Sequence, residues 1–89
     1  MSEWQLRVAG PAQRHLAQLP DRVATAVAEF ILGPLRDEPH RVGKPLQREL
    51  TSYHSARRGA YRVIYRIDEA TSTIDVVHID HRSRVCRVR

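Results

Sequence analysis

Residues 57–66 carry the side chains of this sequence that are best suited to chemistry on a phosphate group. Two neighbouring arginines, Arg57 and Arg58, precede a glycine, and Arg62 and Arg66 follow it. The guanidinium group is planar and can hold a phosphate through two parallel hydrogen bonds, which a lysine ammonium cannot do. The spacing therefore indicates binding of a phosphate chain, with these four arginines as candidate binding residues.

The segment 61–67 alternates in the way that is typical of a half-buried β-strand. Successive side chains of a strand point to opposite faces of its sheet. Two sets of residues follow from this rule: Tyr61, Val63, Tyr65 and Ile67 on one face, and Arg62, Ile64 and Arg66 on the other. We expect the first set to pack on the core, so that Arg62 and Arg66 form an electrostatic platform on an open face.

Histidines are the candidates for proton transfer, because histidine exchanges protons near neutral pH. His81, next to Arg82, is the best-placed candidate for a general base, and His54 is the second. His78 alternates with Ile79, so we expect it to face the helices as a structural residue.

The composition favours an acidic partner. The chain has 15 Lys and Arg residues against 10 Asp and Glu residues, a formal net charge of +5, and Lys44 is its only lysine. A basic, arginine-dominated small chain favours nucleic acid or an acidic protein as its partner. The length of 89 residues predicts one domain, residues 1–89, with a single small core.

Cys86 is the only cysteine, which excludes an intramolecular disulfide and suits a reducing cytoplasm. We expect no signal peptide, because no apolar run follows a basic start, and no apolar stretch approaches the ~20 residues that span a bilayer. The five histidines and one cysteine show no zinc-binding spacing, so no metal or other cofactor is expected. The sequence thus predicts a soluble cytoplasmic domain.

The elements that must position these residues follow from periodicity and from turn residues. We expect a strand over 4–8, a helix that begins at Pro11, and a second helix that begins at Asp21 and ends at Gly33–Pro34, with an optional last turn to Leu35. Residues 36–48 are expected to form a surface loop. Three strands then follow, at 50–56, 61–67 and 74–79, with a turn at Arg58–Gly59 before the second.

This order predicts a small α+β fold. The N-terminal strand and a three-stranded antiparallel meander would make a four-stranded sheet, with the helical hairpin on one face and the other face open.

Three motifs carry a resemblance to a known family. The segment 50–65, LTSYHSARRGAYRVIY, resembles the core of RelE-type toxins, which ends in Tyr-Arg-Val-Ile-Tyr. Gly-Lys-Pro-Leu at 43–46 resembles the family's loop before its second strand, and Ile-Asp-His-Arg at 79–82 resembles the Ile-x-His-Arg that closes its last strand. The three motifs stand in order and at the right spacing, and the resemblance covers nearly the whole length.

The resemblance implies the toxin of a type II toxin–antitoxin system in the RelE/ParE superfamily. RelE members cleave mRNA in the ribosomal A site without a metal, by attack of the 2′-hydroxyl to leave a 2′,3′-cyclic phosphate. ParE members on the same fold instead poison DNA gyrase. The implied partner is an acidic, RelB-like antitoxin, in a heterodimer or heterotetramer.

The resemblance also implies roles for single residues. Arg62 matches the family's catalytic arginine and Arg82 its second arginine, while Arg57, Arg58, Lys44 and Arg66 would contact flanking RNA phosphates. His81 or His54 would act as the base, because the positions of the family's second-strand lysines hold Tyr53 and Ser55 here.

Cys86 stands near the family's usual tyrosine, and it could donate the proton to the leaving group. This departure leaves two alternatives to the nuclease: a ParE-like gyrase inhibitor, and a catalytically weakened relative that still binds an antitoxin.

Overall fold

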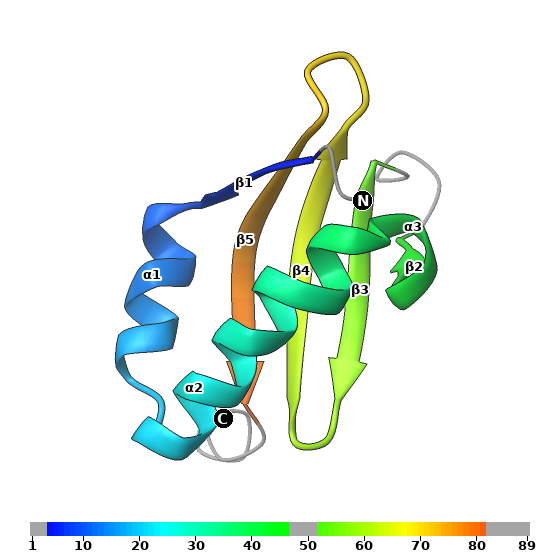
Figure 1. Ribbon diagram of the computed structural model, residues 1–89. Coiled ribbons are helices and arrows are strands. Elements are labelled where there is room, and N and C mark those ends of the chain that lie inside the picture. Colours follow the sequence, from blue (N-terminus) through cyan, green and yellow to red (C-terminus); the bar gives the residue numbers. More distant parts are fainter. Residues whose placement is uncertain (1–3, 47–51, 82–89) are drawn as a thin grey trace.

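A mixed β-sheet with helices on one face forms the framework of the protein (Figure 1). The computed structural model describes residues 4–46 and 52–81. The strand order is β1-β5-β4-β3-β2, in a five-stranded sheet. The strands are β1 (Gln5–Val8), β2 (Lys44–Pro45), β3 (Tyr53–Arg58), β4 (Tyr61–Asp68) and β5 (Thr73–His81).

The predicted α+β class is confirmed, and so is the antiparallel meander of the last three strands. The predicted number of four strands was wrong, because Lys44–Pro45 pairs with β3 as a fifth, short strand. The N-terminal strand β1 runs parallel to β5 and closes the opposite edge. The strand expected at 50–56 begins at Tyr53 in the described part of the chain and extends to Arg58.

The helices are α1 (Gly10–Ala17), α2 (Asp21–Phe30), a π-helical turn η1 (Ile31–Leu35) and α3 (Pro39–Val42). The second helix does not end at Gly33–Pro34, and the alternative of a last turn to Leu35 is confirmed, because η1 carries the helix through Pro34. Proline lacks an N–H and its ring clashes with the carbonyl four residues earlier in an α-helix, whereas the wider π-turn accommodates it. The continued turn buries Leu35 in the core.

The segment expected to be a surface loop, 36–48, contains α3 and β2 within its described part. Gly43 lies between them and lets the chain pass close to β3. A Cβ at this position would collide with the hydroxyl of Tyr65 and lie 3.0 Å from the carbonyl oxygen of Ser55. This close approach holds β2 against the sheet, where Lys44 pairs with Ser55.

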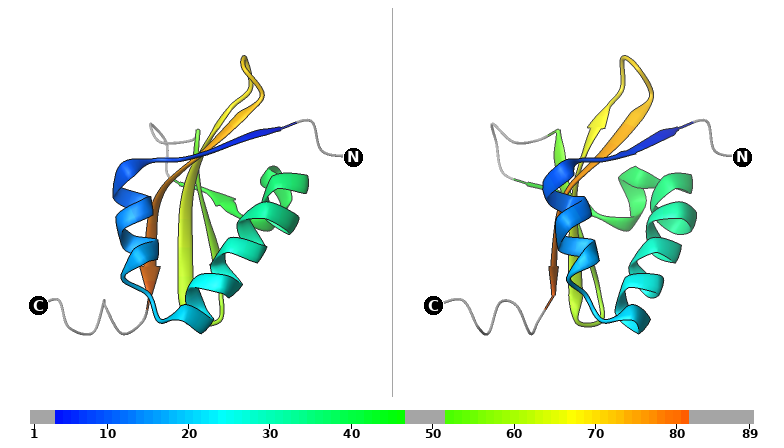
Figure 2. Two further views of the ribbon diagram at one scale, coloured as in Figure 1. Left: turned by 60° about the vertical axis from the view of Figure 1, so that its left-hand side comes forward. Right: turned by 90° about the vertical axis from the view of Figure 1, so that its left-hand side faces the viewer.

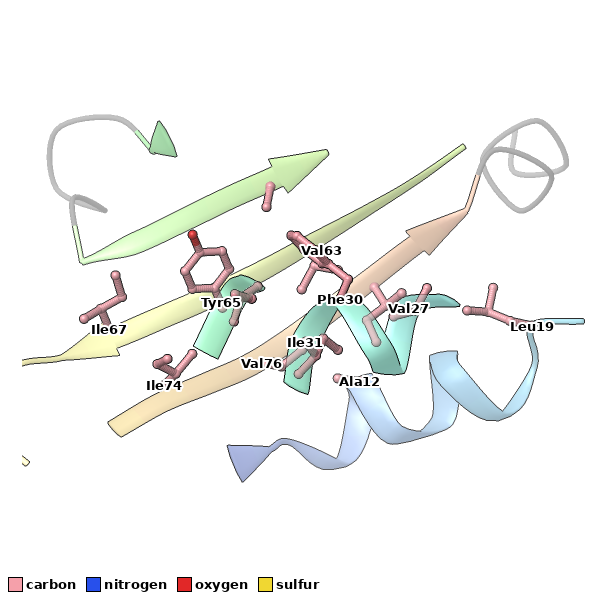
Figure 3. Packing of buried hydrophobic residues seen from close by; sticks show 13 residues of the cluster. Ala12, Leu19, Val27, Phe30, Ile31, Val63, Tyr65, Ile67, Ile74 and Val76 are labelled. Atoms are coloured by element: carbon pink, nitrogen blue, oxygen red, sulfur yellow. The ribbon is translucent and has the colours of Figure 1, made fainter. Parts of the chain in front are cut away.

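The core lies between the sheet and the helices (Figure 3). Strand alternation sends Val63, Tyr65 and Ile67 of β4 toward α2 and η1, as predicted. The helices and the neighbouring strands complete the core with Ala12, Leu19, Val27, Phe30, Ile31, Leu35, Ala56, Ile74, Val76 and Ile79. No helix in the described ranges is long and apolar enough to cross a membrane.

A β-bulge interrupts the alternation of β5. Ile64 pairs with His78 but the next residue, Tyr65, pairs with Val76, so that Val77 is an extra residue on β5. The bulge lets Val76 and Ile79 both enter the core although they are three positions apart. His78 therefore lies on the face opposite to α2, η1 and α3, and the prediction that it faces the helices was wrong for these three. Its ring contacts α1, which lies at the edge of the sheet, through His15.

Candidate nucleic-acid interface

One face of the sheet is not covered by any described helix, and we call it the open face. Figure 2 shows α2, η1 and α3 on the other side of the sheet, while α1 runs beside β5. Cross-strand pairs place side chains on the open face in three rows across β3, β4 and β5. These rows are Arg57–Arg62–Asp80, Ser55–Ile64–His78 and Tyr53–Arg66–Asp75.

The row at Arg66 is charge-balanced. Arg66 donates a hydrogen bond to Asp75 across 3.3 Å and lies 3.9 Å from Asp68. Arg7 of β1 approaches the same Asp75 at 3.6 Å. Arg66 was predicted to bind RNA, but its charge is shared here with two carboxylates, which reduces its attraction for a phosphate.

The row at the hairpin end is positively charged. Arg57 and Arg62 are direct cross-strand partners and both are exposed. Within residues 4–46 and 52–81 neither forms an ion pair, and the same holds for Lys44, which β2 brings onto the open face beside Ser55. Like charges directly opposite one another on a sheet are destabilising. A bound phosphate would relieve that repulsion.

A tight turn creates this arrangement. The hairpin between β3 and β4 closes at Gly59–Ala60, one position later than predicted, with Gly59 at φ +56°. A positive φ at the first central residue fits a type II′ turn, for which glycine is preferred. The turn sets the register that places Arg57 opposite Arg62.

Two of the predicted site residues lie on the helix-covered face instead. Arg58 and His81 are both in register with Tyr61. The Arg58 guanidinium carbon lies 4.5 Å from the centre of the Phe30 ring, a cation–π contact. The structure thus separates Arg58 from Arg57, and His81 from Arg62.

Tyr61 also packs on the helices from this face. Its hydroxyl donates to the carbonyl oxygen of Ala26 at 3.5 Å, and burial raises the pKa of Tyr61. This side chain thus belongs with the core, as predicted from the alternation of β4.

His54, the second candidate for the base, is buried under the helices. Its ring stacks on Tyr65 with centroids 5.5 Å apart, and His40 of α3 lies 5.8 Å from it. Burial lowers the pKa of His54 below its ordinary value, although the Ser52 backbone and Glu69 act in the opposite sense. An RNA on the open face would not reach this imidazole. Arg82 and Cys86 lie outside the described residues.

A dyad of His78 and Asp80, which sequence periodicity does not predict, lies on the open face. The His78 Nε2 lies 2.8 Å from the Asp80 Oδ1. Asp80 is in turn the cross-strand partner of Arg62. The bulge in β5 hid this pair, because unbroken alternation assigns His78 to the core. Among the described residues, no group of three or more histidine, cysteine, aspartate or glutamate side chains could hold a metal ion.

Comparison with known proteins agrees with this architecture. The family described as the ParE toxin of type II toxin–antitoxin systems, parDE, matches residues 6–86. Two proteins of Mycobacterium tuberculosis are similar to this chain. Toxin RelE is 44% identical over 96% of this chain and 88% of its own length. Toxin RelG is 48% identical over 94% of this chain and 97% of its own length.

Solved structures show the same fold. The RelBE2 toxin–antitoxin complex of M. tuberculosis contains a chain that is 48% identical, with a TM-score of 0.86 over 93% of this chain and 95% of that one. The isolated E. coli RelE toxin shares only 14% identity, but it superposes with a TM-score of 0.72 over 97% of this chain and 99% of that one.

The family match and the two similar toxins assign the chain to the toxins of type II toxin–antitoxin systems. The chain belongs to the ParE toxin family within the RelE/ParE superfamily, and it is a type II toxin of the RelE group.

Proposed function

We propose that this toxin is a ribosome-dependent mRNA endonuclease that cleaves without a metal, by attack of a ribose 2′-hydroxyl on the adjacent phosphate. The products would be a 2′,3′-cyclic phosphate and a 5′-hydroxyl end. The observation that carries the proposal is the pair of exposed, directly opposed arginines, Arg57 and Arg62, on the open face. The resemblance to RelE toxins supports the same activity.

The chemistry explains why two arginines would be placed side by side. The attack generates a five-coordinate phosphorus with additional negative charge on its oxygens. Preorganised cations that are aimed at developing charge lower such a barrier more than any other single contribution. Arg62 is the residue that we assign to this role, while Arg57 and Lys44 would hold the neighbouring phosphates. Arg82 and Cys86 remain proposed contributors, as the clamp on the scissile phosphate and the acid for the leaving group.

We also propose that an acidic antitoxin binds this toxin, in a heterodimer or heterotetramer. Two observations support it: a 48% identical toxin was solved as a toxin–antitoxin complex, and this chain carries a net charge of +5. Charge complementarity of this kind accelerates association and fixes the orientation of the partner.

Primer extension on mRNA with translating ribosomes tests the nuclease. Purified wild-type toxin should produce discrete cleavage ends, and Arg62→Ala should lower the cleavage rate by at least about 10²-fold, the scale seen when one preorganised charge-stabilising group is removed. Arg22→Ala is the matched control, because Arg22 is an exposed arginine in the first turn of α2, on the covered side of the sheet. Equal cleavage by wild type and Arg62→Ala would contradict the assignment of Arg62.

The second candidate function is inhibition of DNA gyrase. Two observations favour it: the matching family is named for ParE, and His81 lies on the face opposite to Arg62. Gyrase supercoiling assays with the purified toxin distinguish the two activities. Inhibited supercoiling together with intact mRNA would favour the gyrase poison and overturn the nuclease.

A further inference from the structure

We propose that His78, oriented by Asp80, is the catalytic base that takes the proton from the attacking 2′-hydroxyl, with the neighbouring Arg62 holding the phosphate. This inference rests on the proposed nuclease function and adds to it the residue that transfers the proton.

The bulge in β5 brings His78 to the reaction face. His78 is in register with Ile64 and Asp80 with Arg62, so both members of the dyad lie on the face opposite to α2, η1 and α3. His78 and Arg62 are diagonal neighbours on adjacent strands. Such neighbours lie roughly 7–8 Å apart on a sheet, within reach of long side chains. An imidazole and a guanidinium at this spacing can engage the 2′-hydroxyl and the phosphate of a single nucleotide.

The hydrogen bond to Asp80 fixes the chemical state of the imidazole. With the Nε2–H donated to the Asp80 carboxylate across 2.8 Å, the Nδ1 atom carries the lone pair. A carboxylate behind a histidine selects its tautomer, holds its ring and stabilises the imidazolium that forms when the ring accepts a proton. The side chains remain accessible to a substrate, with His78 41% and Asp80 34% exposed.

The first helix, α1, also contacts His78. The His15 ring of α1 packs edge-on against the His78 ring, with centroids 4.4 Å apart. The Nδ1 of His15 accepts the backbone N–H of Ile79 at 3.2 Å, so this imidazole is tied to the edge of β5. The groups that face His78 are therefore Asp80 on its own strand, Arg62 on β4 and His15 on α1.

The positions of the other histidines leave His78 as the base. All five lie within the described residues. His54 is buried and His81 is in register with the inward-facing Tyr61. His40 belongs to α3 and pairs with Glu69 at 2.8 Å. His15 is engaged by Ile79 at the sheet edge.

Asp80 also keeps Arg62 available for the substrate. A carboxylate directly opposite an arginine would ordinarily neutralise the charge of the arginine, but the Asp80 carboxylate is hydrogen-bonded to His78. In the described chain no ion pair joins Arg62 to Asp80.

Proton transfer to His78 accompanies the formation of the new bond to phosphorus. The 2′-hydroxyl proton passes to Nδ1 of His78 while the 2′-oxygen forms a bond to phosphorus. The bond from phosphorus to the 5′-oxygen breaks, and that oxygen takes a proton from the leaving-group acid, the role proposed above for Cys86, to become the 5′-hydroxyl. The imidazolium then returns its proton to the conjugate base of that acid through solvent, so the net change is the RNA chain converted to a cyclic phosphate and a hydroxyl end.

The test is single-turnover cleavage on mRNA-loaded ribosomes. His78→Gln should slow cleavage by about 10²–10⁴-fold, the usual contribution of a positioned base. Asp80→Asn should slow cleavage less, and the loss should fall on the rate at saturating mRNA-loaded ribosomes rather than on the concentration that gives half of that rate. Asp80 is a positioning residue, and this split is a readout that a purely structural role would not produce.

His40→Gln is the matched control and should retain the wild-type rate, because His40 lies on the helix side. Added imidazole should partly restore cleavage to His78→Ala, which separates loss of the base from loss of the fold. Wild-type rates in His78→Gln, or a His78→Ala variant that folds but is not restored by imidazole, would overturn the inference and leave the nuclease intact. Failure of the wild type to cleave would overturn the nuclease itself, and the assigned base with it.

Discussion

At the scale of single residues, His54 makes the stability of the toxin sensitive to acid. Its imidazole is buried, and its Nδ1 has no hydrogen-bond partner in the described structure. Burial lowers its pKa in the folded chain, while the unfolded chain keeps the ordinary value of 6.5. The unfolded state therefore binds the proton more readily, so this contribution to stability is present above about pH 6.5 and is lost as the pH falls through the folded-state pKa.

His54→Phe should flatten this dependence, because phenylalanine can still stack on Tyr65 but does not titrate. We expect urea midpoints of the variant to fall less than those of the wild type between about pH 7.5 and about pH 5. His40→Gln should keep most of the acid-dependent fall, because burial is a larger cause of the shift than the charge of His40. The same fall in His54→Phe as in the wild type would refute the assignment.

Replacement of Gly43 and of Gly33 by alanine should change the stability of the fold in opposite directions. A Cβ on Gly43 would collide with the Tyr65 hydroxyl, which donates to the Pro39 carbonyl at 2.6 Å, whereas a Cβ on Gly33 meets nothing within 4 Å. We expect Gly43→Ala to cost roughly 1–3 kcal/mol, as overpacking does. Gly33→Ala should stabilise the helical segment by roughly 0.5–1 kcal/mol. Chemical denaturation of both variants measures the two signs.

Burial also controls the ionisation of the Tyr65 phenol. Its hydroxyl lies in the core, and burial raises the pKa of Tyr65 to about 12. The phenol therefore stays protonated as a hydrogen-bond donor to Pro39, and α3 stays attached to the sheet through this bond.

At the scale of elements, the β3–β4 hairpin aligns the two arginines of the open face. Gly59 adopts φ +56°, where a residue with a Cβ is strained by about 1–2 kcal/mol. Gly59→Ala should lower the free energy of unfolding by about that amount and reduce RNA binding, because the register of Arg57 and Arg62 depends on the turn. Ala60→Gly is the control, since Ala60 has no positive φ, and it should change both quantities little.

The edge of β5 is protected by two different elements. The strand β1 pairs with its first half, from Thr73 to Val76, and His15 of α1 accepts the N–H of Ile79 in its second half. An uncovered edge strand would present unpaired backbone groups to other chains. The helix and the strand together therefore leave the open face, rather than this edge, as the surface available for binding.

At the scale of the whole molecule, the fold separates basic side chains that are neighbours in the sequence. Arg57 and Arg58 are adjacent in sequence but lie on opposite faces. This pair gives a sharp test, because only Arg57 should contact RNA phosphates.

Arg57→Gln should reduce the salt dependence of binding to a single-stranded RNA oligonucleotide by about 0.7 in the slope of log K against log salt. Arg58→Gln should leave the slope unchanged, although it removes the contact with Phe30 and lowers stability. Titrations at salt concentrations from about 50 to about 200 mM measure the slope. Equal reductions in both variants would mean that the open face is not the RNA-binding surface.

The sequence by itself determined much of this protein. The period of β4 assigned Val63 and Tyr65 to the core and Arg62 to the open face, because alternation is a local property of an extended chain. The start of the second helix at Asp21 and the turn at Gly59 were equally local signals. The arginine-rich composition indicated an anionic partner, because net charge is a sum over residues and does not depend on the fold.

The tertiary structure alone decided which candidate groups meet. The bulge at Val77 exists because Val76 and Ile79 must both fill a core that distant helices complete, and it turns His78 outward beside Arg62. The pairing of Lys44 with Ser55 likewise depends on contact between two segments that are separate in the sequence. The passage of the helix through Pro34 depends on the packing around it. Local pattern can assign a side chain to a face only while the register is regular, and the register is set by the partner strand.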